Sequence, residues 1–158
     1  MAHLRQVGFW RKKAAPEGEG ELPFPTPAPS PGPRPSAWLQ RYLTAHALLE
    51  SYEHGSSTCR LCGIQNGCAT LTDGVFVWPE GLWHYVGAHG VALPGDFVQH
   101  IADAAAADCS PQSPGSLAAL PLRNHLLYDP AGGEPSRLPP DTLAWLAAHA
   151  SLDLSGAQ

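Results

Sequence analysis

Two cysteines and two histidines place the strongest constraint on how this chain folds. Cys59 and Cys62 enclose two residues, and His84 and His89 follow in the pattern C-x2-C-x21-H-x4-H. A CxxC in a tight turn directs two thiolates to one side of the backbone, and Gly63 directly after it lets backbone amides turn towards the sulfurs. We therefore predict that Cys59, Cys62, His84 and His89 bind one structural Zn²⁺.

The composition gives an independent reason to expect such a constraint. The chain has 158 residues, which suits one folded unit with additional segments at its ends. Hydrophobic residues make up 44%, but Ala supplies many of them, and 17 Pro and 16 Gly interrupt regular structure. A core this modest buries too little apolar surface to be held firmly without a metal or a disulfide.

The distribution of the cysteines favours the metal. Cys59, Cys62 and Cys68 lie within ten residues and close to histidines, whereas a disulfide framework usually spreads paired cysteines along a secreted chain. The fourth cysteine, Cys109, stands apart. Met1 to Trp10 contains His3, Arg5 and Gln6 and has no continuous apolar run, so we expect no signal peptide, no membrane span and a cytoplasmic location.

Proline dominates the segment before the cysteines. Eight prolines stand between residues 14 and 35, a density that disfavours helix and sheet and favours extended polyproline conformations. We expect residues 1–35 to form an N-terminal arm with a disordered, proline-rich linker. Within the arm, the apolar patch Val7–Trp10 could stay free for a partner or dock on the domain, and we favour docking.

The central residues 36–109 carry the patterns of regular structure. Apolar spacing of three and four residues predicts a helix that Ser36 caps and that continues to Gly55. Leu71 to Trp78 is typical of a hairpin with Asp73-Gly74 as its turn. Further helices are predicted from Pro79 to His89, with Gly90 as a stop, and from Pro94 to near Cys109.

Residues 110–158 are rich in Pro and Gly around the apolar stretch Leu117 to Tyr128. The spacing of Leu143, Leu146 and Ala150 predicts a last helix from Asp141 to about Ser151, and we expect this part to pack on the domain. The chain as a whole is predicted to be an α+β protein, in which a zinc-braced hairpin and helix are flanked by other helices.

The histidine spacing requires a distorted helix end. Residues five apart on an ideal helix are rotated by about 140°, whereas residues four apart are rotated by about 40°. Gly87 and Gly90 let the last turn tighten or widen enough for His84 and His89 to converge. If one ligand is misassigned, we expect it to be a histidine rather than a cysteine.

The sequence pattern is compatible with other interpretations of the cluster. The CxxC could be a free dithiol beside two ordinary histidines, or a redox pair, although the Gly and Asn residues that follow it favour a turn over the helix of a thioredoxin-type motif. Cys68 could replace one ligand, but a cysteine at this position more often packs as a small hydrophobe. His46, His54 and His100 are weaker alternative ligands.

A set of short motifs gives the chain a resemblance. These motifs are Cys59-Arg-Leu-Cys62-Gly63, Asn66-Gly67, Thr72-Asp-Gly74, Trp78-Pro-Glu-Gly-Leu82, His84-Tyr-Val86, His89 and Leu93-Pro94. Together they resemble a group of small, uncharacterised bacterial proteins over residues 52–101, and the resemblance implies the zinc site but no activity. The order of cysteines, hairpin and histidine-bearing helix is also similar to a C2H2 zinc finger, but the gap of 21 residues exceeds the usual one of about 12 and argues against finger-type DNA reading.

Function is less constrained than the metal site. Glu80 and Asp73 are the acids that catalysis would use, yet the chain has no serine elbow, P-loop, dinucleotide fingerprint or zinc-deaminase signature, so we lean against an enzyme. The predicted helix after Pro79 has no Lys or Arg, and the net charge is −5, so a nucleic-acid partner is disfavoured. We expect a protein-interaction or adaptor component of a larger assembly, with a nucleic-acid binder and a small hydrolase or nuclease as alternatives.

Overall fold

The computed structural model of the chain describes residues 3–10, 22–27, 36–107, 111, 126–128, 131, 136–137, 140–141, 144 and 148. The elements, in chain order, are β1 (Arg5–Gln6), α1 (Ala37–Leu43), β2 (Leu48–Tyr52), β3 (Ala69–Thr72), β4 (Phe76–Pro79), α2 (Leu82–His89), α3 (Gly95–Ala106), β5 (Leu126–Leu127) and β6 (Ser136–Arg137). The fold is α+β, as the sequence predicts.

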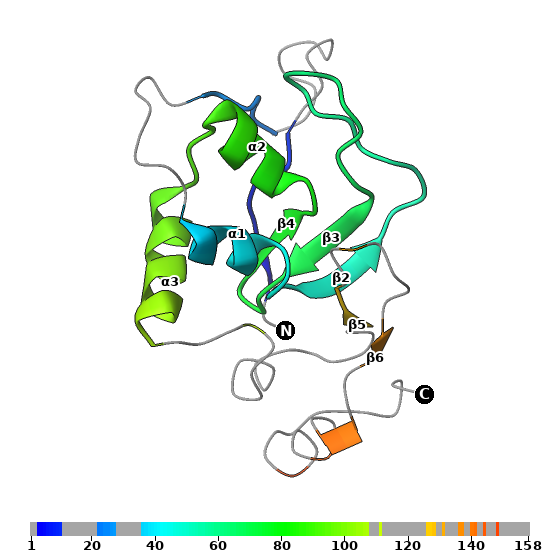
Figure 1. The fold of residues 1–158 in the computed structure, drawn as a ribbon, viewed down its shortest axis with the longest axis vertical. Helices are drawn as coiled ribbons and strands as arrows, with labels where there is room; N and C mark the ends of the chain where they lie inside the picture. The colour runs from blue at the N-terminus through cyan, green and yellow to red at the C-terminus, as the bar shows by residue number, and fades with distance from the viewer. Residues whose placement is uncertain are drawn as a thin grey trace.

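The strands form one mixed sheet in the order β1-β4-β3-β2-β5-β6. β1 runs parallel to β4, and the other neighbouring pairs are antiparallel. Figure 1 shows α1 next to α2 and to α3, and α1 contacts both of these helices. The sheet therefore joins strands from all three sequence ranges, 1–35, 36–109 and 110–158, into one unit.

The central hairpin is confirmed. β3 and β4 pair antiparallel, with Leu71 opposite Trp78 and Thr72 opposite Val77. Gly74 has a φ of 94° in the turn, a value that glycine adopts without the steric cost of a Cβ. The Asp73-Gly74 signal thus located the turn correctly.

The predicted helix from Ser36 to Gly55 is wrong in its second half. Ser36 caps α1 as expected, since its side chain accepts a hydrogen bond from the amide of Leu39. The helix ends at Leu43, where Thr44 leaves the helical region with φ −129° and ψ −91°. Residues 48–52 form β2 instead, and the pairing of this strand with both β3 and β5 buries its apolar start in the sheet.

The next two helices agree more closely with expectation. α2 ends at His89, and Gly90 adopts a left-handed conformation as its C-cap. The helix begins at Leu82, because Pro79 is the last residue of β4 rather than part of the first helical turn. α3 begins after Pro94, as predicted, ends at Ala106, and buries Phe97 and Ile101.

The core lies between the sheet and the helices. Trp78 on β4 is fully buried, and its indole nitrogen donates a hydrogen bond to the carbonyl of Leu43 at 3.1 Å. Its ring centroid lies 5.5 Å from that of Phe97 and 6.2 Å from that of Tyr42. These contacts bring α1, α3 and the hairpin together around one aromatic centre.

The N-terminal patch docks on the rest of the fold. Val7 is buried in the core, and its amide donates to the carbonyl of Val77 at 2.9 Å. Trp10 packs against Tyr85 of α2 in an edge-on arrangement, with ring centroids 5.9 Å apart. The structure therefore favours the docked alternative over the free one.

Only part of the proline-rich range is described. In residues 22–27, Pro25 is fully buried and Pro27 forms an isolated antiparallel bridge with Val91, so this stretch contacts the folded unit. The rest of residues 14–35 lies outside the described residues.

The last helix falls mostly outside the described residues as well. Within its expected range, Asp141, Ala144 and Ala148 are helical and exposed. The short strands β5 and β6 were not anticipated, since the patterns in residues 110–139 indicated no strands. Among the residues that the structure describes, no helix has the length and apolar character needed to cross a bilayer.

Candidate metal centre

The four predicted ligands converge at one point. Sγ of Cys59 lies 3.4 Å from Nε2 of His89, and Sγ of Cys62 lies 3.3 Å from Nε2 of His84. The two Nε2 atoms are 3.2 Å apart, and all four ligand atoms lie within 4.8 Å of one another. Bonds of about 2.3 Å to sulfur and about 2.0–2.1 Å to nitrogen give tetrahedral edges of about 3.6 Å (S to N) and about 3.3 Å (N to N). The residues are thus positioned to bind a metal ion.

The cysteine loop has the backbone geometry of a metal knuckle. The amide of Cys59 donates to the carbonyl of Ile64 at 2.8 Å, and the amide of Gly63 donates back to the carbonyl of Cys59 at 2.9 Å. Gly63 has a φ of 78°, which allows the chain to reverse within four residues. The amide of Leu61 points at Sγ of Cys59 at 3.4 Å and supports its thiolate form.

The end of α2 explains how histidines five residues apart reach the same point. The amide of Gly90 donates to the carbonyl of Tyr85, and the amide of Val91 donates to the same carbonyl at 3.1 Å. A hydrogen bond that spans five residues instead of four widens the last turn, as in a π-type turn. The distortion expected at this helix end is therefore present, and it turns His89 towards His84.

A set of close contacts locks the cysteine loop onto the start of α2. The side-chain amide of Asn66 donates to the carbonyl of Gly81 at 3.1 Å. A Cβ on Gly81 would lie 2.2 Å from Cγ of Asn66, and a Cβ on Gly67 would lie 2.4 Å from Oε2 of Glu80. Both positions therefore need glycine, because a side chain would separate the cysteine loop from the helix that carries the histidines.

Glu80 has a structural task at this junction. Its Oε2 accepts hydrogen bonds from the amides of Cys68 and Ala69 at 2.9 and 3.1 Å, and its Oε1 accepts one from the hydroxyl of Tyr128 at 2.8 Å. Both carboxylate oxygens are thus occupied in joining β3, the start of α2 and the segment after β5. The carboxylate lies outside the four-residue ligand group.

The electrostatics of the site favour the forms that bind metal. Burial by itself would raise the pKa of the Cys59 thiol, but hydrogen bonds from the amides of Cys62 and Leu61 outweigh it and hold that pKa below its usual value. Desolvation, together with the nearby charge of His89, lowers the pKa of His84. A thiolate and a neutral imidazole are the forms that coordinate a metal.

The alternative ligands lie elsewhere. Cys68, His46, His54 and His100 are not members of the ligand group. His46 packs edge-on against Trp38, and Nε2 of His100 lies 2.9 Å from Oδ2 of Asp73. The aromatic side chains near the site also belong to the interior, since Trp78 is fully buried and Tyr85 is 4% exposed. Neither ring is available to stack on a base.

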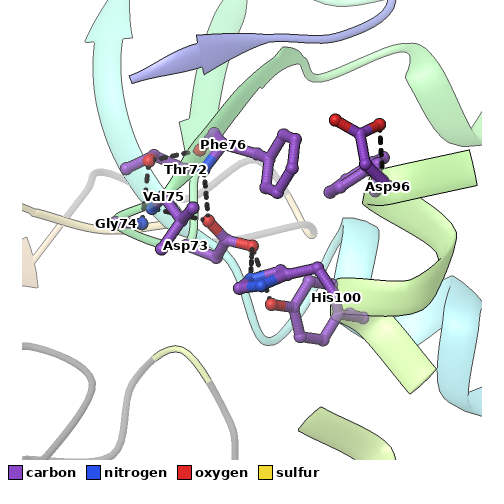
Figure 2. Close-up of polar contacts among 9 residues, drawn as sticks. Thr72, Asp73, Gly74, Val75, Phe76, Asp96 and His100 are labelled. Atoms are coloured by element: carbon purple, nitrogen blue, oxygen red, sulfur yellow. Dashed lines mark hydrogen bonds and ion pairs between the residues drawn. The ribbon is translucent and has the colours of Figure 1, made fainter. Parts of the chain in front are cut away.

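A second polar centre, which no sequence pattern indicated, surrounds the buried Asp73. Figure 2 shows its carboxylate between the turn of the hairpin and α3. Oδ1 accepts hydrogen bonds from the amides of Val75 and Phe76, and Oδ2 is within hydrogen-bonding distance of the hydroxyl of Tyr42 and of His100. The turn signal was visible in the sequence, but the partners from α1 and α3 were not, because they lie 31 and 27 residues away.

Comparisons of the chain with protein-family models, with curated proteins and with solved structures found no match.

Proposed function

We propose that the protein is a zinc-braced protein-interaction module, in which Zn²⁺ bound by Cys59, Cys62, His84 and His89 holds the cysteine loop against α2. Two thiolates and two imidazoles in a tetrahedral arrangement are a donor set typical of Zn²⁺. When bound, the ion supplies a rigid cross-link between two segments, and the protein residues supply the surface that a partner contacts.

The closed ligand set is the observation that carries this proposal. Four protein donor atoms within 4.8 Å of one another suffice to complete a tetrahedral shell around Zn²⁺, and a shell so completed has no coordination position for a water that could be activated. Glu80, the nearest acid considered for catalysis, uses both carboxylate oxygens in structural hydrogen bonds. These features favour a structural ion over a catalytic one.

The loop that the ion would hold displays apolar side chains. Ile64 is 50% exposed at the tip of the loop, next to the exposed Cys62 and the half-buried Leu61. An apolar residue on a rigid, metal-fixed turn suits contact with a protein surface, because little conformational entropy is lost on binding. The exposed residues of α2 include no Lys or Arg, which a nucleic-acid partner would require.

A capture experiment with matched surface variants tests the interaction role. Tagged wild-type protein, Ile64→Asp and Val98→Asp are incubated with extract from the source cells after nuclease digestion. Val98 is 49% exposed on α3 and away from the loop, so it is the control. We expect a stoichiometric protein to be retained by wild type and by Val98→Asp but not by Ile64→Asp. Retention of nucleic acid in a sample not treated with nuclease, or zinc-dependent hydrolysis by the purified protein, would contradict the proposal.

A further inference from the structure

A cleft lies next to the candidate metal centre where three segments meet. Gly8–Trp10 and Leu22 of the N-terminal arm, the loop residues Ser57, Arg60 and Asn66, and the residues Pro79, Gly81 and Tyr85 around the start of α2 line a space of about 200 Å³. This is smaller than the roughly 300 Å³ at which pockets for drug-sized molecules begin. Its volume therefore suits a ligand with one ring and one small polar group.

The walls of the cleft are aromatic. Trp10 and Tyr85 both line it and pack edge-on with ring centroids 5.9 Å apart. Gly8 has a φ of 76°, and a Cβ at this position would lie 2.6 Å from Cδ1 of Leu82, so the backbone approaches the start of α2 closely here. A flat ring fits such walls, because it gains stacking and edge contacts at low cost in conformational entropy.

The charged group of the cleft is a hydrogen-bond donor. Arg60 is the one charged residue among those described that line it. Its Nη1 donates to the carbonyl of Thr58 at 2.7 Å and its Nε to the carbonyl of Trp10 at 3.4 Å, which fixes the guanidinium at this position. Its Nη2 has no hydrogen bond among the described residues, and neither does the buried Nε1 of Trp10.

We propose that this cleft binds an aromatic carboxylate, with the acid group on Arg60 and the ring against Trp10. A carboxylate accepts charge-assisted hydrogen bonds from a guanidinium, so it satisfies the Nη2 of Arg60 that has no hydrogen bond among the described residues. Two sources share this chemistry: a free aromatic acid, and the C-terminal aromatic residue of a peptide. The second source deepens the proposed interaction function by naming a partner class, and for that part the inference rests on the proposed function.

The test uses the zinc-loaded full chain and three probes: phenylacetate, N-acetyl-L-phenylalanine and N-acetyl-L-phenylalaninamide. Binding is followed by amide chemical shifts in ¹H–¹⁵N spectra. We expect at least one acid to bind with a Kd of about 1 mM, the strength typical of a fragment. The amide, which lacks the negative charge, is expected to bind at least tenfold more weakly. Tight binding of phenylacetate alone identifies a free acid as the ligand, whereas tighter binding of N-acetyl-L-phenylalanine identifies a peptide terminus.

Two variants locate the binding. Arg60→Gln is expected to weaken the binding of both acids at least tenfold. Arg41→Gln is expected to leave their binding unchanged, because Arg41 is an exposed residue of α1 outside the cleft. If Arg60→Gln does not fold, the comparison of acid and amide on the wild-type chain decides in its place. No saturable shift with either acid at 10 mM, or equal binding of acid and amide, would overturn the proposal. Because these measurements need no protein partner, their failure is distinguishable from failure of the capture experiment.

Discussion

The hydroxyl of Tyr42 on α1 lies 2.7 Å from Oδ2 of Asp73 in the hairpin turn, and both groups are buried. Because the same carboxylate oxygen lies 2.9 Å from Nε2 of His100 on α3, one side chain connects two helices to the turn of the central hairpin. Asp73 is therefore a structural centre of the fold and is not accessible for acid–base chemistry on a ligand.

Alkaline pH should destabilise the fold through Tyr42. Burial and then the charge of Asp73 raise the pKa of Tyr42 well above its usual value of 10.0. Above pH 10 the unfolded chain loses this proton while the folded chain keeps it, so the free energy of unfolding falls by up to about 1.4 kcal/mol per pH unit. Urea unfolding between pH 9 and 11 measures the slope.

The variant Tyr42→Phe provides the control for this slope. This variant should lower the free energy of unfolding by about 1–3 kcal/mol at neutral pH, because Asp73 loses a buried hydrogen-bond donor. It should also make the decline above pH 10 shallower, though not flat, because burial raises the pKa of Tyr85 as well. An identical slope in wild type and variant would refute this role of Tyr42.

Two glycine-to-alanine variants should differ in stability, because Gly81 lies at the crowded junction of the cysteine loop with α2 and Gly95 lies in open space. Gly81→Ala is expected to lower the free energy of unfolding by about 1–3 kcal/mol or more, since the new Cβ would lie 2.2 Å from Cγ of Asn66. Gly95→Ala should be neutral or slightly stabilising, because no atom lies within 4 Å of the new Cβ and alanine favours helix. Thermal melts of both proteins check this prediction, which a neutral Gly81→Ala would disprove.

The N-terminal arm should contribute to stability like a core segment. Val7→Ala is expected to cost about 1–3 kcal/mol, since Val7 is 4% exposed and packs in the core. Val98→Ala, at a residue 49% exposed on α3, should change stability by less than about 0.5 kcal/mol. Equal effects in denaturant unfolding would argue that the arm is not part of the cooperative unit.

Cys62 of the CxxC turn and Cys68, six residues later, should differ sharply in their contribution to metal affinity. Cys62→Ser removes a ligand and should weaken Zn²⁺ binding by more than about 100-fold. Cys68→Ser, outside the ligand group, should leave the affinity unchanged. Competition with a chromophoric chelator measures both affinities, and a loss in Cys68→Ser as large as in Cys62→Ser would show that the ligands are misassigned.

The candidate site was predictable because each of its halves carries a local and chemically specific signal, although the two halves lie 22 to 30 residues apart. The CxxC turn, Gly63 and the glycines at the end of α2 act over a few residues, and the structure places all four predicted ligand atoms together. The widened turn that brings His89 to His84 was also foreseeable, since ideal helical geometry forbids the convergence.

The errors in the fold predicted from the sequence arise where interactions between distant residues decide the structure. The apolar run at Leu48 and Leu49 fits a helix as well as a buried strand, and only its pairing with β3 and β5 decides between them. β1 has two residues and exists because β4 offers a free edge. The bonds of Tyr42 and His100 to Asp73 likewise depend on tertiary packing, which no local pattern records.

The central claim is that a metal ion held by Cys59, Cys62, His84 and His89 braces the fold. The most direct measurement is native mass spectrometry of the purified chain, combined with melting curves before and after EDTA. Zinc-finger sites contribute roughly 10–16 kcal/mol at neutral pH, as much as the total stability of many domains. We therefore predict one Zn²⁺ per chain and substantial unfolding on chelation. A metal-free protein with an unchanged melting temperature in EDTA would contradict the account.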